Sequence, residues 1–113
     1  MDEKTREDWQ EWFDHLTEEH EGDEIRIEVA GPDIGDEVEV DAVPLTYVEY
    51  DRKDDVVIVA VGDREGSLPV SLRHLVHHPE AVTYEPALGR GGWFIDIRAA
   101  DGSRTRVAPA PRP

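Results

Sequence analysis

The histidines at positions 74, 77 and 78 form a cluster whose residue types could bind a metal ion. On a helix, His74 and His78 would share one face at the i, i+4 spacing that a divalent metal uses. The context instead indicates an extended segment that ends at Pro79, and on a strand these two side chains stand about 13 Å apart, too far for one ion. We therefore predict structural or surface histidines and no metal site, and His74 and His78 are the candidate ligands if a metal does bind.

Carboxylates are so abundant in the first half of the chain that no single pair is informative. Glycoside hydrolysis needs two carboxylates held across a cleft, whereas the acidic residues expected on strands share an outward register, which indicates a solvated face. These residues are Glu24, Glu28, Glu37, Glu39 and Asp41. No serine lies in a nucleophile elbow, and the glycine-rich segment 89–92 lacks the Lys-Ser/Thr pair of a phosphate-binding loop. We predict no catalytic residue and no cofactor.

Two tyrosines are candidates for a contact surface. Tyr47 and Tyr50 fall on opposite faces of one expected strand, so at least one of them should be exposed. Exposed tyrosines are enriched in protein interfaces. With His74 and His77, these tyrosines are the predicted interaction residues.

The first element expected to position these residues is a helix over residues 5–21. Its apolar stripe follows the i, i+3, i+4, i+7 spacing of one helical face and consists of Trp9, Trp12, Phe13 and Leu16. Thr5 is the expected N-cap, and Gly22 is the expected stop. Because aromatic stripes at this spacing usually belong to a core, we predict that the helix packs on a sheet. Docking of the stripe into a partner's groove is the alternative.

Beyond residue 23 the apolar period becomes two, which predicts strands. The expected strands cover residues 25–29, 38–40, 45–50, 56–61, 68–76, 81–85, 93–99 and 104–108. Val38 and Val40 are expected on one face, and Pro44 is expected to bend or offset the strand that follows it. The run 56–61 is apolar throughout, so it should be a central strand buried on both faces.

The charges divide sharply along the chain. Residues 1–55 hold 21 Asp/Glu and 5 Lys/Arg, a net charge of −16, whereas residues 56–113 have a net charge of +1. A concentrated anionic half disfavours direct binding to nucleic acid or to anionic lipid. Two interpretations of the many acids and few lysines stay open. They are adaptation to a high-salt cytoplasm, where repulsion is screened, or an arginine-rich genome with an ordinary acidic protein.

Length and composition indicate one domain. The chain has 113 residues and no cysteine, which excludes disulfides, thiolate zinc sites and cysteine nucleophiles. No apolar run approaches the length of a membrane span and residues 1–8 show no apolar signal region, so a soluble cytoplasmic protein is expected. We predict a single domain over residues 1–108, followed by a Pro-rich flexible tail at 109–113.

Five segments recur in an order that resembles a family of small bacterial domains of unknown function. The segments are WQEWFDHL (9–16), EVAGPDIGD (28–36), VPLTY (43–47), HLVHHP (74–79) and IRAADG (97–102). The resemblance covers nearly the whole chain. It implies a single domain with an N-terminal helix and an antiparallel sheet, and it brings no assigned activity, cofactor or catalytic residue.

These observations together predict an α+β fold: one N-terminal helix packed on a curved, mostly antiparallel sheet of six or seven strands. Whether the sheet closes into a small barrel is left open. The favoured function is a non-enzymatic acidic binding or interaction module with a protein partner of unknown identity and an open oligomeric state. The alternatives are an anionic mimic of nucleic acid that blocks a basic partner, and a small metal-binding protein or hydrolase that depends on His74 and His78.

Overall fold

A computed structural model describes residues 2–32, 35–62, 72–86 and 92–111 of the protein. A short 3-10 helix, η1 (Arg6–Asp8), leads directly into the helix α1 (Trp9–His20). The strands are β1 (Asp2–Lys4), β2 (Glu24–Gly31), β3 (Gly35–Asp51), β4 (Val56–Val61), β5 (Leu72–His77), β6 (Pro79–Glu85), β7 (Phe94–Ala99) and β8 (Arg104–Pro109). Within the described residues, no helix has the length and apolar character needed to cross a bilayer.

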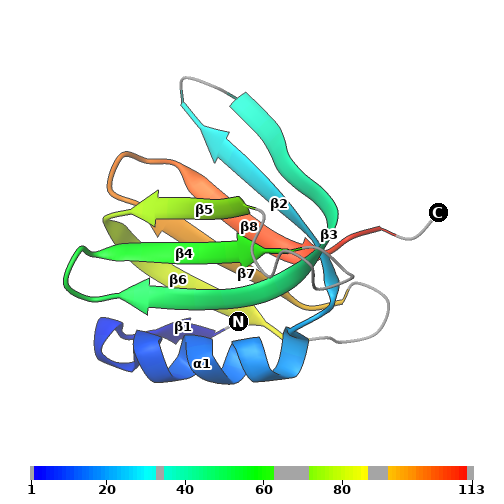
Figure 1. Cartoon of the computed structure of the whole chain (residues 1–113). Helices are drawn as coiled ribbons and strands as arrows, with labels where there is room; N and C mark the ends of the chain where they lie inside the picture. Colours follow the sequence, from blue (N-terminus) through cyan, green and yellow to red (C-terminus); the bar gives the residue numbers. More distant parts are fainter. Residues whose placement is uncertain (1, 33–34, 63–71, 87–91, 112–113) are drawn as a thin grey trace.

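The strands form one antiparallel sheet in the order β1-β6-β7-β8-β2-β3-β4-β5. The predicted architecture of an N-terminal helix on an antiparallel sheet of six or seven strands is confirmed for β2 to β8, and the three-residue β1 adds an eighth strand at one edge. The sheet curves into two walls, with β3 to β5 in front, β6 to β8 behind and α1 below (Figure 1). Closure into a barrel, which the sequence left open, does not occur. The strand order ends at β1 and β5, and the helix fills the space between the walls.

The predicted apolar stripe positions α1 against the sheet. Trp9, Phe13 and Leu16 are buried, whereas Trp12 is only partly buried because it lies at the margin of the stripe, against the ring of Tyr84 at 5.4 Å. On the opposite side, the ring of Trp9 meets that of Tyr50 edge-on at 5.1 Å. The helix is thus held between β3 and β6.

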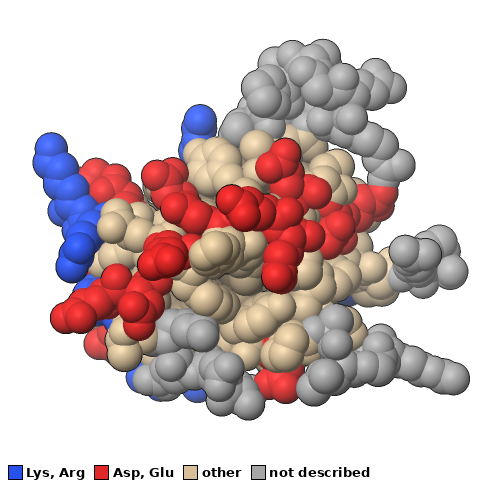
Figure 2. Space-filling view, turned by 90° about the horizontal axis from the view of Figure 1, so that it is seen from below, with Lys and Arg blue, Asp and Glu red and all other residues tan. Residues whose placement is uncertain are grey.

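The ends of the helix differ in detail from the prediction. Thr5 precedes η1 as expected, but its hydroxyl donates to the carboxylate of Asp8 at 2.6 Å and caps no backbone amide. Gly22 ends the helix as predicted with a φ of 90°, a conformation that costs glycine little. Its amide donates to the carbonyl of Leu45 at 2.9 Å, which docks the end of the helix on β3. The exposed side of α1 belongs to a face on which Asp and Glu dominate (Figure 2).

Two irregularities redirect the first half of β3. The pairing with β2 skips Glu39 and Ala42, and Ala42 has a φ of 59°. A skipped residue reverses the face to which the following side chains point. Val40 therefore enters the core opposite Ile27, but Val38 points outward and is exposed. The expectation that Val38 and Val40 share one face is wrong for this reason.

β3 changes partner at Pro44, where the sequence predicted a bend. Residues up to Pro44 pair with β2, and residues from Leu45 onward pair with β4. Proline lacks the N–H that an inner strand would donate, so it suits the position at which one pairing ends. β4 then lies between β3 and β5 and is buried on both faces except for the half-buried Ile58, as its continuous apolar sequence predicted.

The strands of the second half follow the predicted order with shifted ends. The described part of the first of them, β5, starts at Leu72, and residues 68–71 of its predicted range lie outside the described residues. The chain turns at His78, whose φ is 52°, and Pro79 begins β6. β8 reaches Pro109, one residue further than predicted, and the amide of Ala110 donates to the carbonyl of Glu24 at 2.9 Å. The glycine-rich segment 89–92 is described only at Gly92, and the last two residues of the predicted tail are not described.

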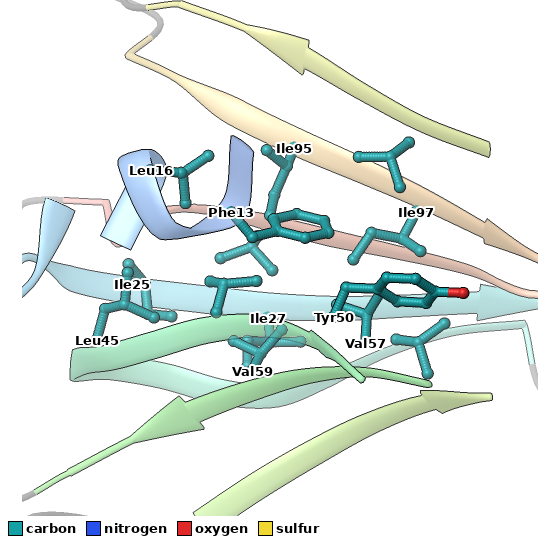
Figure 3. Close-up of a cluster of buried hydrophobic side chains, with 14 of the residues drawn as sticks. Phe13, Leu16, Ile25, Ile27, Leu45, Tyr50, Val57, Val59, Ile95 and Ile97 are labelled. Carbon is teal, nitrogen blue, oxygen red and sulfur yellow. The ribbon is translucent and has the colours of Figure 1, made fainter. Parts of the chain in front are cut away.

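The core lies between the two walls and the helix. Phe13 and Leu16 project from α1 toward Ile95 and Ile97 of β7, and Ile27 and Val59 lie on the other side of the cluster (Figure 3). The ring of Tyr50 belongs to the same cluster, but its hydroxyl points out of it (Figure 3). This one core places several polar side chains at its margins, where the candidate sites lie.

Candidate functional site

An open groove runs between α1 and the second half of β3. It encloses about 340 Å³ and is lined by Asp14, Thr17, Glu18, Tyr47, Val48 and Glu49. We call these six residues the acidic groove. Its three carboxylates have no hydrogen bond or ion pair with any described residue. The groove therefore presents concentrated negative charge that the described part of the chain leaves without a counter-charge.

Thr17 fixes the width of the acidic groove. Its hydroxyl accepts a hydrogen bond from the amide of Val48 at 2.9 Å and lies within donating distance of the carbonyls of Val48 at 3.1 Å and Phe13 at 2.9 Å. Since β3 pairs with β4 on its other side, this edge of Val48 would otherwise present unpaired backbone groups. The threonine thus joins the helix to the strand edge and holds the carboxylates of both elements near each other.

Tyr47 closes one side of the acidic groove and is itself held from the sheet. The guanidinium Nε of Arg73 donates to the hydroxyl of Tyr47 at 3.1 Å. Tyr47 and Arg73 are both in register with Ala60 of β4. The small alanine between them lets the two long side chains meet across the central strand. Tyr47 is half-buried, so part of its ring is available at the surface.

A second group of polar side chains, the Asp55 cluster, consists of Arg6, Tyr50, Asp55 and His78. The carboxylate Oδ1 of Asp55 accepts from the hydroxyl of Tyr50 at 2.6 Å and from Nη1 of Arg6 at 2.7 Å. The other oxygen lies 3.3 Å from Nδ1 of His78. Arg6 also donates to the carbonyl of Pro79 at 2.9 Å. The cluster ties η1, the end of β3 and the β5–β6 corner together.

The electrostatics of the Asp55 cluster follow from these contacts. The hydrogen bond from Tyr50, helped by His78 and Arg6, lowers the pKa of Asp55. Burial and the neighbouring carboxylate raise the pKa of Tyr50. Asp55 and His78 both adopt left-handed backbone conformations, with φ values of 53° and 52°. The amide of His78 donates to the carbonyl of Asp55 at 2.9 Å, so the two strained corners support each other.

The Asp55 cluster resembles half of a catalytic triad, in which a carboxylate orients an imidazole. The His78 side chain is 71% exposed, so its other nitrogen is open to solvent. However, no described serine or threonine hydroxyl lies within hydrogen-bonding distance of His78. The geometry therefore supports an anchoring role for the cluster more strongly than nucleophilic catalysis.

His74 lies in a different environment, the β5 cleft. This cleft holds about 140 Å³ between β5 and the hairpin of β7 and β8, and its lining includes Val29, His74, Leu75, His77 and Thr105. Nε2 of His74 lies 3.4 Å from the hydroxyl of Thr105, which is buried. Burial lowers the pKa of His74, and the carboxylate of Glu39 opposes that shift. His74 thus links the two walls of the sheet where they are not paired.

On the outer face of β7 and β8, Asp96 and Arg106 form an ion pair, unlike the carboxylates of the acidic groove. The guanidinium of Arg106 donates to both oxygens of Asp96 at 3.0 Å and lies over the ring of Phe94 at 4.2 Å. A shallow cavity of about 230 Å³ lies beside this pair, with Glu28 and Arg104 among its lining residues. Because its carboxylates lie among arginines, it offers no comparable excess of one charge.

The structure separates most of the residues that the sequence singled out. His74 contacts Thr105 and His78 contacts Asp55, so the two candidate metal ligands do not converge. Among the described residues, no group of three or more His, Asp or Glu side chains is arranged to hold a metal ion. His77 is exposed on β5. Tyr47 and Tyr50 lie on opposite faces, as their spacing predicted, with Tyr50 buried.

The sequence did not single out several residues of these candidate sites, among them Arg6, Thr17 and Asp55 and the groove carboxylates Asp14, Glu18 and Glu49. Arg6 carried a weak signal, since it is one of only two basic residues before position 26 in a strongly acidic segment. Asp55 looked like one of several interchangeable acids in a polar turn. Thr17 gave no signal, because its partner Val48 lies 31 positions away in the sequence.

Known proteins are similar to this chain over nearly its whole length. An uncharacterized protein of Aquifex aeolicus (strain VF5) is 32% identical over 107 residues, which cover 93% of this chain and 89% of the relative. No solved structure matches the chain. The model of a family of unknown function, DUF5335, matches residues 1–109, in agreement with the resemblance inferred from the ordered segments. The chain therefore belongs to the family of unknown function DUF5335.

Proposed function

We propose that this protein is a non-enzymatic binding module whose acidic groove receives a basic segment of a protein partner. The observation that carries the proposal is the set of three carboxylates, Asp14, Glu18 and Glu49, that face one groove without a described counter-charge. Guanidinium and ammonium groups are the natural counter-charges for such a groove. The half-exposed ring of Tyr47 adds an aromatic surface over which a guanidinium can lie.

The surroundings of the groove favour the same class of partner. The α1 face is dominated by Asp and Glu, and Lys and Arg appear at one end of this view (Figure 2). Such a face repels nucleic acid and anionic lipid and attracts basic protein surfaces over distances of about 10 Å at ordinary salt. A basic polypeptide therefore fits this surface better than nucleic acid or anionic lipid, which are polyanionic.

A matched pair of variants tests the proposal with a short oligo-arginine peptide as the ligand in isothermal titration. Neutralising the groove as Asp14→Asn, Glu18→Gln and Glu49→Gln should weaken binding about tenfold or more, since exposed ion pairs each contribute about 0.2–1 kcal/mol. The control removes three exposed carboxylates elsewhere, as Asp36→Asn, Asp54→Asn and Glu80→Gln. Equal losses in both variants would show general charge attraction and remove the groove from the proposal.

A second candidate function is mimicry of nucleic acid, which the charge spacing along the helix favours. Seven exposed acidic residues fall between positions 7 and 21: Glu7, Asp8, Glu11, Asp14, Glu18, Glu19 and Glu21. At a rise of about 1.5 Å per residue this gives one carboxylate per about 3 Å, close to the one phosphate per about 3.4 Å of a DNA strand. Displacement of labelled duplex DNA from protamine by the wild type, but not by a variant with Glu7, Glu11 and Glu18 changed to Gln, would favour mimicry.

A further inference from the structure

The described sheet has free strand edges at β5 and along the first half of β3, besides the short edge at β1. β5 ends the strand order and pairs only with β4. The first half of β3 pairs with β2 on one side and with no described strand on the other. A free edge presents a row of unpaired N–H and C=O groups that can accept another strand. Both edges are independent of the acidic groove.

The exposed apolar side chains coincide with these edges. Among the described residues, the large hydrophobic side chains that are exposed are Val38 at 47%, Leu72 at 45% and Leu75 at 46%. Leu72 and Leu75 are three positions apart on β5 and therefore point to opposite faces of the sheet. A helix docked on one face would cover only one of them, whereas a strand added along the edge covers part of both.

Val38 is exposed because the pairing of β3 with β2 skips Glu39. In an unbroken strand Val38 and Val40 would both face the core, but the residue skipped in the pairing turns Val38 outward. Irregularities of this kind commonly re-aim a side chain toward a functional surface. An aliphatic side chain turned into water at a free edge is stabilised when another strand covers it.

The two edges carry opposite charges. β5 contains Arg73, His74 and His77 and no carboxylate, in a chain with 27 Asp/Glu. The free half of β3 carries only acidic charges, at Asp36, Glu37, Glu39 and Asp41. Like charges discourage β3 from pairing with another β3, whereas opposite charges across a strand pair stabilise it. Each edge is thus complementary to the other in charge and in exposed apolar residues.

We propose that the protein forms a two-fold dimer in which residues 35–41 of β3 in each copy pair with β5 of the other copy. The two edges flank the same side of the molecule, where β5 and the β2–β3 hairpin lie one above the other (Figure 1). A two-fold axis on this side therefore brings each edge to its complement twice, as an isologous interface requires.

Charge reversal and mixing of the full-length protein test this dimer by sedimentation velocity over a broad concentration range. The wild type should sediment as a dimer. Arg73→Glu alone, and Glu37→Lys with Glu39→Lys, should each raise the dimer dissociation constant at least about tenfold, because each change occurs twice in the symmetric interface. An equimolar mixture of these two variants should restore the dimer, because both of its contacts then join opposite charges.

The control for mixing replaces two acids of α1 outside the acidic groove, as Glu11→Lys with Glu19→Lys. This variant keeps both edges and should dimerise with itself, but it should leave Arg73→Glu monomeric. Circular dichroism shows whether each variant is folded. If a charge variant does not fold, Leu75→Gln serves as a further change that should disrupt the dimer. A wild type that stays monomeric at every concentration would overturn the proposal. A dimer that persists in folded Arg73→Glu, or a mixture that fails to associate, would also overturn it.

Discussion

The hydroxyl of Tyr50 donates a hydrogen bond of 2.6 Å to Oδ1 of Asp55, and this contact joins the core to the surface of the protein. The ring of Tyr50 is buried against Trp9, while Asp55 lies in the turn that follows β3. Arg6 donates to both groups, so one buried aromatic residue organises the start of the helical segment and the end of β3. An apolar body with a polar tip is what such a position requires.

We expect Tyr50→Phe to lower the free energy of unfolding at pH 7 by about 1–2 kcal/mol, since the hydrogen bond to a charged acceptor is lost while the ring still fills the core. Urea unfolding measures this change. Tyr47→Phe removes the same atom from a half-buried ring that contacts Arg73, and should cost less than about 0.5 kcal/mol. Similar losses in both variants would contradict a special role for the contact with Asp55.

Acid should weaken the Asp55 cluster. The pKa of Asp55 in the folded protein lies below its ordinary value of about 3.9, so the folded state binds fewer protons than the unfolded state in this range. Its stabilising contribution is complete above that ordinary value and is lost as the pH falls through the folded pKa. Asp55→Asn should therefore destabilise the protein at neutral pH and flatten the acid part of the stability curve. An unchanged acid slope would show that Asp55 is not coupled to folding.

His74 should also make the free energy of unfolding depend on pH, over a higher pH range than Asp55 does. Burial lowers its pKa in the folded protein, with Glu39 opposing the shift, so stability should fall as the pH drops below about 6.5, the ordinary pKa of histidine, toward the folded pKa. His74→Gln should remove this slope in urea unfolding experiments between neutral and mildly acidic pH. His77→Gln changes the same residue type at an exposed position of the same strand and serves as the control.

The side chains of the apolar stripe of α1 should each stabilise the protein in proportion to how deeply they are buried. Phe13 is fully buried, so Phe13→Ala should cost about 3–5 kcal/mol and lower the melting temperature by many degrees. Trp12 packs at the edge of the core, and Trp12→Ala should cost clearly less despite its larger ring. Thermal unfolding of the two variants decides the point. A change of only a degree or two for Phe13→Ala would mean that the helix is not a structural part of the fold.

The free energy of unfolding should rise with salt concentration. The net charge of −15 arises from the first half of the sequence, and many carboxylates have no described counter-charge. In molar potassium chloride the screening length falls to about 3 Å, which removes most of the repulsion among them. The midpoint of unfolding should therefore be higher in molar than in low salt. Neutralising Glu11, Glu18 and Glu19 to Gln should reduce this difference, and a midpoint that falls with salt would rule out repulsion as the cause.

Local periodicity determined much of this protein from the sequence alone. The spacing of Trp9, Phe13 and Leu16 marks the buried side of the helix, and the unbroken apolar run of β4 marks the strand buried on both faces. These signals are reliable because the period of a side chain along a helix or strand depends only on backbone geometry. The charge division is likewise a property of the sequence, and it argued against direct binding to nucleic acid or anionic lipid before any contact was known.

Tertiary structure decided what no local pattern encodes. Arg6, Tyr50 and Asp55 meet although Arg6 lies 44 and 49 positions from its partners, and Thr17 reaches Val48 across 31 positions. The skipped residue Glu39 turns Val38 outward through strand pairing, which a single strand cannot show. Contacts of this kind depend on which strands become neighbours and in which register. That choice is made by the packing of the whole core, so it appears only when the sheet and the helix are assembled.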